Sequence, residues 1–323
     1  MVQRLGQPAR PRRAVRVVSV AAALVVIAGL AAAGNPRGTG PPGAEQVGPA
    51  IREALSDTAA TSPTGTPTAD RLAAPSLPAP AVDPLDEAAA RARRITDGTD
   101  EWASFTLADR KAGRLVGDTR TGEVTNSESV VKAWLAADLL ATAAAEKRRL
   151  TAYERTRMTS MIRVSDDNAA EVIWRWLGAD ASIRKMIKVC RMTDTTVYPG
   201  MWSLTQISSR DLARLGVCLA PGPGKLLSRV VSAELLGLMR SVDPSDAFGI
   251  QQAQPAGRGA RLAVKNGWTE HGGGETGRWS VNCLGIWGPD LRWVLAVTLR
   301  YPIPRGLSYG ADVCRRVTTA LFR

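Results

Sequence analysis

The chain has 323 residues, of which 45% are hydrophobic and 5% aromatic, and it carries 42 Lys and Arg against 30 Asp and Glu. It is too long and too apolar to be disordered throughout, and four Cys are too few for a disulfide-stapled miniprotein. One His and the lack of a CxxC pair disfavour a histidine-rich metal site and a zinc ribbon. We therefore expect neither of these two kinds of metal site.

The first 33 residues have the pattern of an export signal. Five Arg precede an apolar run at residues 17–33, which ends in three Ala before a Gly. The run is long for a cleaved signal and short for a transmembrane span, so cleavage and an uncleaved N-terminal membrane anchor both stay open. No Cys ends the run, which disfavours a lipid anchor. Either topology places the rest of the chain outside the cytoplasm, secreted or anchored to the cytoplasmic membrane by residues 17–33.

Residues 34–85 are rich in Pro, Gly, Thr and Ala, which predicts a disordered linker interrupted by one short helical pattern at 51–55. The folded domain is expected at residues 86–323. Its charges are scattered and show no interleaving of aromatic and basic residues. We therefore expect that the domain does not bind nucleic acid. We also expect a monomer.

Within the domain, the first patterns are a helix at 86–94 and a hairpin at 101–118 whose strands alternate around the sequence DRKAG. The spacing of apolar residues then predicts helices at 129–147, 151–163, 168–177, 181–189, 209–219 and 228–241. After residue 260 the period becomes two, which predicts a strand ending in KNGW, strands at 279–287 and 291–301, and a last helix at 311–322. Strands on both sides of a helical block indicate one antiparallel sheet with helices packed against it.

The helix predicted at 129–147 begins with Ser129 and Lys132, which form the pattern SxxK. Their spacing puts the hydroxyl and the amine on one helix face, and the positive potential of a helix N-terminus favours an ionised hydroxyl. A Lys can act as the base only if burial or a neighbouring cation lowers its pKa. A plain N-cap role for Ser129 is the alternative. Ser182 and Lys185 repeat the spacing, which we interpret as accidental.

Two further motifs follow. The sequence Ser-Asp-Asp-Asn at 165–168 lies between two predicted helices, where it could hold a hydroxyl and a carboxyl or amide group at a cleft. The alternative is an N-cap for the next helix. The sequence Lys-Asn-Gly-Trp at 265–268 ends a strand. A strand Lys can anchor an anionic group and a neighbouring Gly allows close approach of a ligand, whereas the alternative is an ordinary turn.

The order SxxK, SD and KxG in an exported domain resembles the pattern of class A β-lactamases and penicillin-binding DD-peptidases, a superfamily of serine hydrolases. The resemblance spans residues 86–323. It implies an α+β, β-lactamase/transpeptidase-like fold, with a five-stranded antiparallel sheet flanked by helices and an all-helical subdomain inserted between strands 2 and 3. It also implies an exported serine hydrolase that needs no metal and no organic cofactor and whose candidate ligands are a peptidoglycan peptide or a β-lactam.

Carried over to this sequence, the resemblance implies an acyl-transfer mechanism. Ser129 would be the acylated nucleophile, and Lys132 would be its general base, directly or through water. Ser165 would relay the proton to the leaving nitrogen. The backbone N–H groups of Ser129 and Trp268 would form the oxyanion hole, which stabilises the charge that develops in acyl transfer.

The same resemblance implies the substrate-binding residues. Asp167 takes the place of the usual Asn, although Asn168 would fill that place in a register shifted by one residue. Lys265 and Asn266 would bind the substrate carboxylate, and Gly267 would let the ligand approach the strand.

One family feature is missing. The omega-loop Glu that supports deacylation is not visible, because residues 180–206 contain only Asp180 and Asp194 as acids. If Ser129 is acylated, hydrolysis of the acyl-enzyme should therefore be slow, which favours peptidase-like or acyl-trapping behaviour. The alternative is a non-catalytic envelope protein that retains the fold for binding.

The Cys residues and the single His complete the candidate residues. In the family the last helix packs on the sheet, which favours a disulfide between Cys283 and Cys314 and leaves Cys190 with Cys218. This is one of three connectivities, and four free thiols are the alternative. His271 is expected in an exposed hairpin loop, with a place at the rim of the site as the alternative.

Overall fold

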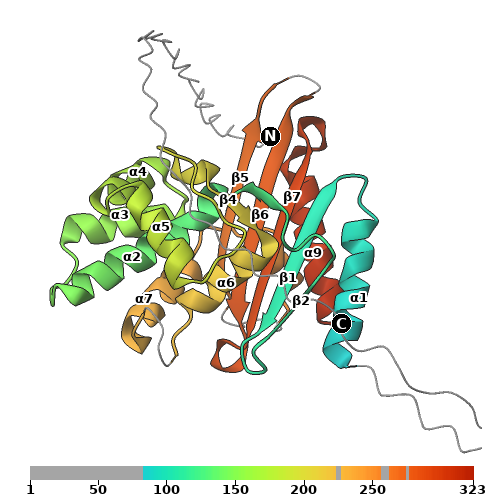
Figure 1. Ribbon diagram of the computed structural model, residues 1–323, viewed down its shortest axis with the longest axis horizontal. Helices are drawn as coiled ribbons and strands as arrows, with labels where there is room; N and C mark the ends of the chain where they lie inside the picture. Colours follow the sequence, from blue (N-terminus) through green and yellow to red (C-terminus); the bar gives the residue numbers. More distant parts are fainter. Residues whose placement is uncertain (1–82, 223–226, 256–261, 274–275) are drawn as a thin grey trace, which may run out of the picture. The chain divides into compact units, whose positions relative to one another are not determined.

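Five antiparallel strands form the sheet of the folded domain, in the order β2-β1-β7-β6-β5 (Figure 1). Their bounds are Trp102–Asp109 (β1), Arg114–Gly117 (β2), Ala263–His271 (β5), Arg278–Trp287 (β6) and Trp293–Pro302 (β7). The computed structural model describes residues 83–222, 227–255, 262–273 and 276–323. The expected export signal, almost all of the linker and the short helix at 51–55 lie outside the described residues.

Helices α1 (Pro84–Asp97) and α9 (Gly306–Leu321) pack against each other and cover one face of the sheet (Figure 1). The Asp83 side chain accepts a hydrogen bond from the N–H of Leu85 at 2.8 Å and so caps α1. Helix α1 therefore begins two residues before the expected domain boundary. The short helix α8 (Ile250–Ala253), which sequence periodicity did not predict, joins α9 on this face.

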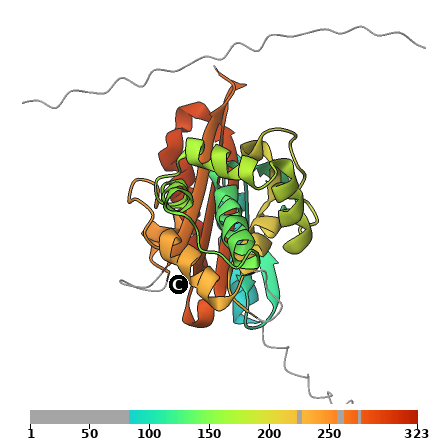
Figure 2. The ribbon, with the colours of Figure 1, turned by 90° about the vertical axis from the view of Figure 1, so that its left-hand side faces the viewer.

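The opposite face of the sheet is covered by α6 (Ser209–Leu219), which contacts β1, β6 and β7. Next to α6, α2 (Lys132–Ala145) runs through the helical half of the molecule (Figure 2), and Trp134 on this helix is fully buried. Around α2 lie α3 (Ala152–Arg163), α4 (Asp167–Trp176), α5 (Asp180–Val189) and α7 (Arg229–Met239). No helix among the described residues is long and apolar enough to cross a membrane.

The α+β fold class and the five-stranded sheet are confirmed, but the insertion between the second and third sheet strands is not all-helical. It contains a two-stranded ribbon of β3 (Val124–Asn126) and β4 (Gln206–Ser208). Each ribbon strand has three residues, which is too short for an alternating pattern to be recognised. The ribbon matters for function because β3 leads directly into the 3-10 turn η1 (Glu128–Val131), which carries Ser129.

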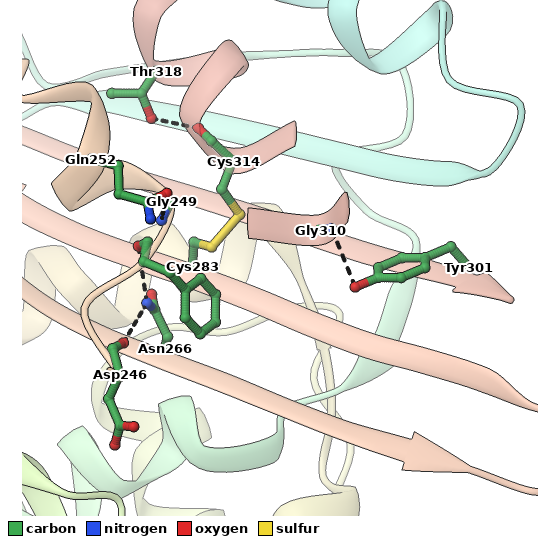
Figure 3. Close-up of a disulfide and its surroundings, with 10 residues drawn as sticks. Asp246, Gly249, Gln252, Asn266, Cys283, Tyr301, Gly310, Cys314 and Thr318 are labelled. Atoms are coloured by element: carbon green, nitrogen blue, oxygen red, sulfur yellow. Dashed lines mark hydrogen bonds between the residues drawn. A yellow bond between two sulfur atoms is a disulfide. The ribbon is translucent and has the colours of Figure 1, made fainter. Parts of the chain in front are cut away.

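Two disulfides connect elements that are distant in sequence, and both have the pairing that the resemblance implies. Cys190 after α5 is joined to Cys218 on α6, and Cys283 on β6 is joined to Cys314 on α9. The second disulfide lies on the α9 side of the sheet, next to the turn at Gly249 (Figure 3). It ties the terminal helix to the sheet within a buried apolar cluster.

We expect each disulfide to contribute about 3 kcal/mol to the free energy of unfolding, because the two closed loops have similar sequence separations of 28 and 31 residues. Urea unfolding of the Cys283→Ala/Cys314→Ala and Cys190→Ala/Cys218→Ala double variants would measure both losses. The matched control is the wild type in reductant, which should lose stability while the quadruple variant does not. Equal stability of all variants would contradict the expectation.

Candidate active site

The three predicted motifs meet at one cleft of about 490 Å³, between η1, the start of α4 and β5. Ser129, Ser165 and Trp268 line it, while Lys132 and Lys265 lie beneath its surface with 0% exposure. A larger cavity of about 730 Å³ lies near the β1–β2 hairpin and the Cys190–Cys218 disulfide. It contains no motif residue, so chemistry rather than size identifies the site.

Strand β5 lies against the turn that carries the candidate nucleophile. A Cβ atom at Gly267 would stand 2.7 Å from the backbone nitrogen of Ser129 and 2.8 Å from that of Val130, which is closer than real Cβ atoms come. Only glycine therefore allows this approach. Because β5 is an edge strand of the sheet, its free side faces the turn, and the backbone of Trp268 follows directly after the point of contact.

The hydroxyl of Ser165 lies between the two buried lysines. It accepts hydrogen bonds from Lys265 Nζ at 2.8 Å and from Lys132 Nζ at 3.3 Å. Lys132 Nζ also donates to the Ser165 carbonyl and to Asp167 Oδ1, each at 2.5 Å. The three donors of Lys132 thus point at the second motif, and among the described residues Ser129 Oγ has no hydrogen-bond partner.

Both lysines have lowered pKa values, which suits proton transfer near neutral pH. Burial is the main cause for Lys132, and the hydrogen bond and charge of Asp167 oppose it. For Lys265, burial and then the positive charge of Lys132 lower the pKa to about 7. Burial raises the pKa of Asp246, whose charge faces both lysines.

The second motif divides its tasks between neighbouring residues. Asp166 is the N-cap of α4, where its side chain accepts a hydrogen bond from the N–H of Ala169 at 3.0 Å. Asp167 instead faces the cleft and pairs with Lys132, and Asn168 lines the same cleft, so either could fill the place of the usual Asn. Ser165 has a left-handed backbone, with φ of 54°, which aims its hydroxyl at the lysines. The N-cap interpretation is therefore confirmed for Asp166, while the functional interpretation of Ser165 and Asp167 stays a prediction.

The third motif is brought to the cleft only in part. Asn266 donates both amide protons to backbone carbonyls, at 2.8 Å to Asp246 and 3.1 Å to Phe248 (Figure 3). It does not line the cleft, in contrast to its expected role in binding a substrate carboxylate. The cause is strand alternation: the side chain of Lys265 faces Ser165, so the next side chain points to the disulfide side of the sheet.

Glu128 is a cleft residue that the sequence did not point to, and its partner is His271. Glu128 directly precedes Ser129, is 2% exposed and has a left-handed backbone with φ of 49°. Its Oε1 lies 2.6 Å from Nε2 of His271, which sits at the end of β5 and lines the cleft. The histidine is therefore at the rim of the site and not in an exposed loop. This contact ties the nucleophile turn to β5 on the side away from the lysines.

Glu171 and Trp202 form the opposite wall. Glu171 lies one helical turn after Asp167, a spacing that places both on one face of α4 and could have revealed it. Its two carboxylate oxygens accept from Arg175 Nε at 2.8 Å and from Trp202 Nε1 at 3.1 Å. The Trp202 ring lies 5.1 Å from Lys132 Nζ and so stands beside the buried amine.

Neither acid of the 180–206 segment lines the cleft. Asp180 accepts from the N–H of Gly200, and Asp194 is engaged by Arg210 and Ser208. The second SxxK sequence is structural as well. Ser182 Oγ and Lys185 Nζ both donate to the buried Asp138, at 2.6 and 2.5 Å.

Comparison with known proteins agrees with this geometry. The model of the "Beta-lactamase enzyme family" matches residues 154–297. The chain is 30% identical over 220 residues to "Putative lipoprotein LppW" of Mycobacterium tuberculosis and of Mycobacterium bovis, covering 65% of this chain and 68% of each relative. This chain belongs to the β-lactamase-like family.

Solved structures share the fold of this β-lactamase-like protein at low sequence identity. PBP-A superposes with a TM-score of 0.59 at 18% identity, over 74% of this chain and 95% of that one. A β-lactamase from Burkholderia vietnamiensis gives 0.57 at 18% identity, over 73% and 95%. The ancestral class A β-lactamase GNCA gives 0.56 at 18% identity, over 72% and 98%. The family match at 154–297 includes the second and third motifs but begins after Ser129.

The buried Lys265 should make stability rise with pH. Its pKa is about 7 in the folded state and near 10.5 when unfolded, so between these values the unfolded chain binds more protons. The free energy of unfolding should therefore increase from pH 7 to 9, with a slope of about 1 kcal/mol per unit from this group. Urea unfolding of Lys265→Met should show a flatter profile. The exposed Lys188→Met is the matched control, and an unchanged slope in Lys265→Met would refute the assignment.

Proposed function

We propose that this protein is an exported serine hydrolase whose Ser129 is acylated by an amide of a cell-wall peptide or by a β-lactam. The observation that carries the proposal is the arrangement around Ser165, whose hydroxyl accepts from both buried lysines at the edge of the cleft that exposes Ser129. A hydroxyl held by two ammonium groups is suited to passing a proton. The family membership supports the same chemistry.

In the proposed acylation step, Ser129 Oγ attacks the carbonyl carbon and its proton passes to the neutral amine of Lys132. The N–H groups of Ser129 and Trp268 would stabilise the oxyanion. As the C–N bond breaks, Ser165 gives its proton to the leaving nitrogen and regains one from Lys132. Lys265 orients the Ser165 hydroxyl and would attract an anionic group of the substrate.

Deacylation has less support from the side chains of the cleft. A water attacking the ester needs a base, and the segment 180–206 brings no carboxylate to the site. Both oxygens of Glu171 already accept hydrogen bonds, from Arg175 and Trp202. We therefore propose that acylation is faster than hydrolysis and that the acyl-enzyme accumulates.

A second candidate function is ligand binding without catalysis. The observation that favours it is the engagement of Lys132, whose donors point at Ser165 and Asp167 instead of at Ser129. In that case the cleft would hold a cell-wall peptide non-covalently.

We also propose that the domain works outside the cytoplasm. Both pairs of Cys form disulfides, which persist in oxidising compartments, and the basic and apolar pattern of residues 1–33 is that of an export signal. The relative LppW is named a lipoprotein. The four Cys of this chain all belong to these disulfides, so the anchor proposed here is the apolar run at 17–33 and not a lipid on a Cys.

A fluorescent penicillin should label the wild-type protein and leave Ser129→Ala unlabelled, because the hydroxyl is the proposed nucleophile. Gel fluorescence and peptide mapping by mass spectrometry would locate the adduct. Ser203→Ala is the matched control, since Ser203 lines the same cleft, and it should label like the wild type. Equal labelling of Ser129→Ala would refute the mechanism, and no labelling of any protein would favour the binding function.

The adduct should also persist. Intact-protein mass spectra recorded after removal of excess benzylpenicillin should show the acylated mass declining more slowly than it formed, by about a hundredfold or more, since deacylation lacks its base. Hydrolysis as fast as acylation would contradict the proposal that the acyl-enzyme accumulates.

A further inference from the structure

The ionisable side chains that line the cleft differ in sign from the protein as a whole. The chain has a formal net charge of +12. The cleft, in contrast, is lined by the carboxylic acids Glu128, Asp167 and Glu171, and no Lys or Arg of the described residues lines it. Lys132 and Lys265 are close by but have no exposed surface. A ligand therefore meets acids at the surface, with the lysines behind them.

Asp167 is the most open of the three acids. Glu128 is 2% exposed and paired with His271. Each oxygen of Glu171 already accepts one hydrogen bond, from Arg175 or Trp202, and its side chain is 39% exposed. The Asp167 side chain is 79% exposed, and only its Oδ1 is engaged, by Lys132. Its Oδ2 has no hydrogen-bond partner among the described residues.

The open oxygen of Asp167 selects ligands by hydrogen-bonding type and by charge. An ionised carboxylate only accepts hydrogen bonds, so an N–H or ammonium group is its favoured neighbour. A ligand carboxylate at the same place would be repelled, by an interaction that is strong at short range and near a protein surface. The distant positive charges of the chain do not cancel this effect, because salt screens them beyond about 8 Å.

The position of Asp167 defines which part of the ligand it meets. Asp167 lines the same cleft as Ser129, and its Oδ1 accepts from Lys132, which lies one helical turn after Ser129. Lys265 lies on the other side of the Ser165 hydroxyl, beneath the surface of the cleft, and is proposed above to attract an anionic group of the substrate. In that proposal the two sides of Ser165 favour opposite charges.

We propose that this cleft prefers acyl donors that carry an ammonium group on the side chain of the acyl group, and that Asp167 is the residue that selects them. The inference rests on the proposed acylation of Ser129. It names the substrate class as a zwitterionic peptide or lactam, with its ammonium at Asp167 and its carboxylate at Lys265.

Three penicillins test the proposal, because they share one nucleus and one phenyl group. Benzylpenicillin has hydrogen, ampicillin an ammonium and carbenicillin a carboxylate on the carbon next to the side-chain carbonyl. Acylation rates of the full-length protein would be measured by competition with a fluorescent penicillin at pH 6, where the ampicillin amine is protonated. The expected order is ampicillin, benzylpenicillin, carbenicillin, with about tenfold between the first and the last.

The decisive variant is Asp167→Asn, in which the ratio of ampicillin to carbenicillin rates should fall to within about twofold of one. Because Asp167 also bonds Lys132, the variant changes all absolute rates, but the ratio cancels a uniform change. Glu171→Gln is the matched control and should keep the wild-type order, since Glu171 is already engaged. Carbenicillin reacting as fast as ampicillin, or an order that survives in Asp167→Asn, would overturn this inference alone. A protein that none of the three acylates would overturn the proposed function together with it.

Discussion

The candidate site depends on the burial of two ammonium groups around one hydroxyl. Lys132 and Lys265 have no exposed surface, and both donate to Ser165 Oγ. Two like charges in a dry environment are costly unless they are paired or neutralised. Lys132 is paired with Asp167, whereas Lys265 responds with a pKa near 7. One lysine is therefore held by a counter-ion and the other is close to losing its proton at neutral pH.

Two residues of the candidate site have an unfavourable backbone conformation, which contacts from distant parts of the chain maintain. Glu128 and Ser165 both have a left-handed backbone, which residues with a side chain rarely adopt. Glu128 is held by His271, from the far end of β5. The Ser165 carbonyl and hydroxyl are held by Lys132 and Lys265. These conformations persist because the sheet and the helical half of the molecule fix their partners, so the fold itself supplies the geometry of the site.

Whether the sequence could predict a residue of this site depends on how far apart along the chain the contacting residues lie. Ser129 and Lys132 are one helical turn apart, so local spacing was enough to find them. The pairing of Glu128 with His271 joins residues 143 positions apart, and no periodic pattern encodes it. Asn266 was expected at the cleft but lies on the other face of β5, because the order of residues in a motif does not state which face of a strand each residue occupies. The β3–β4 ribbon was missed since three residues carry no period.

Asp167 and burial have opposite effects on the amine of Lys132. As the counter-ion of Lys132 it stabilises the protonated amine and so raises the pKa of Lys132, whereas burial lowers that pKa and favours the neutral amine that can accept a proton. Burial is the larger effect, because the pKa of Lys132 is lowered overall. The groups that would form the acyl-enzyme therefore come from the three motifs, which lie on η1, α4 and β5. The base that would hydrolyse the acyl-enzyme has to come from another segment. In the cleft wall next to Lys132, the segment 180–206 contributes the indole of Trp202 instead of a carboxylate. Forming and breaking the acyl bond thus depend on separate parts of the chain, and a change in one loop can alter the second step while the first is kept.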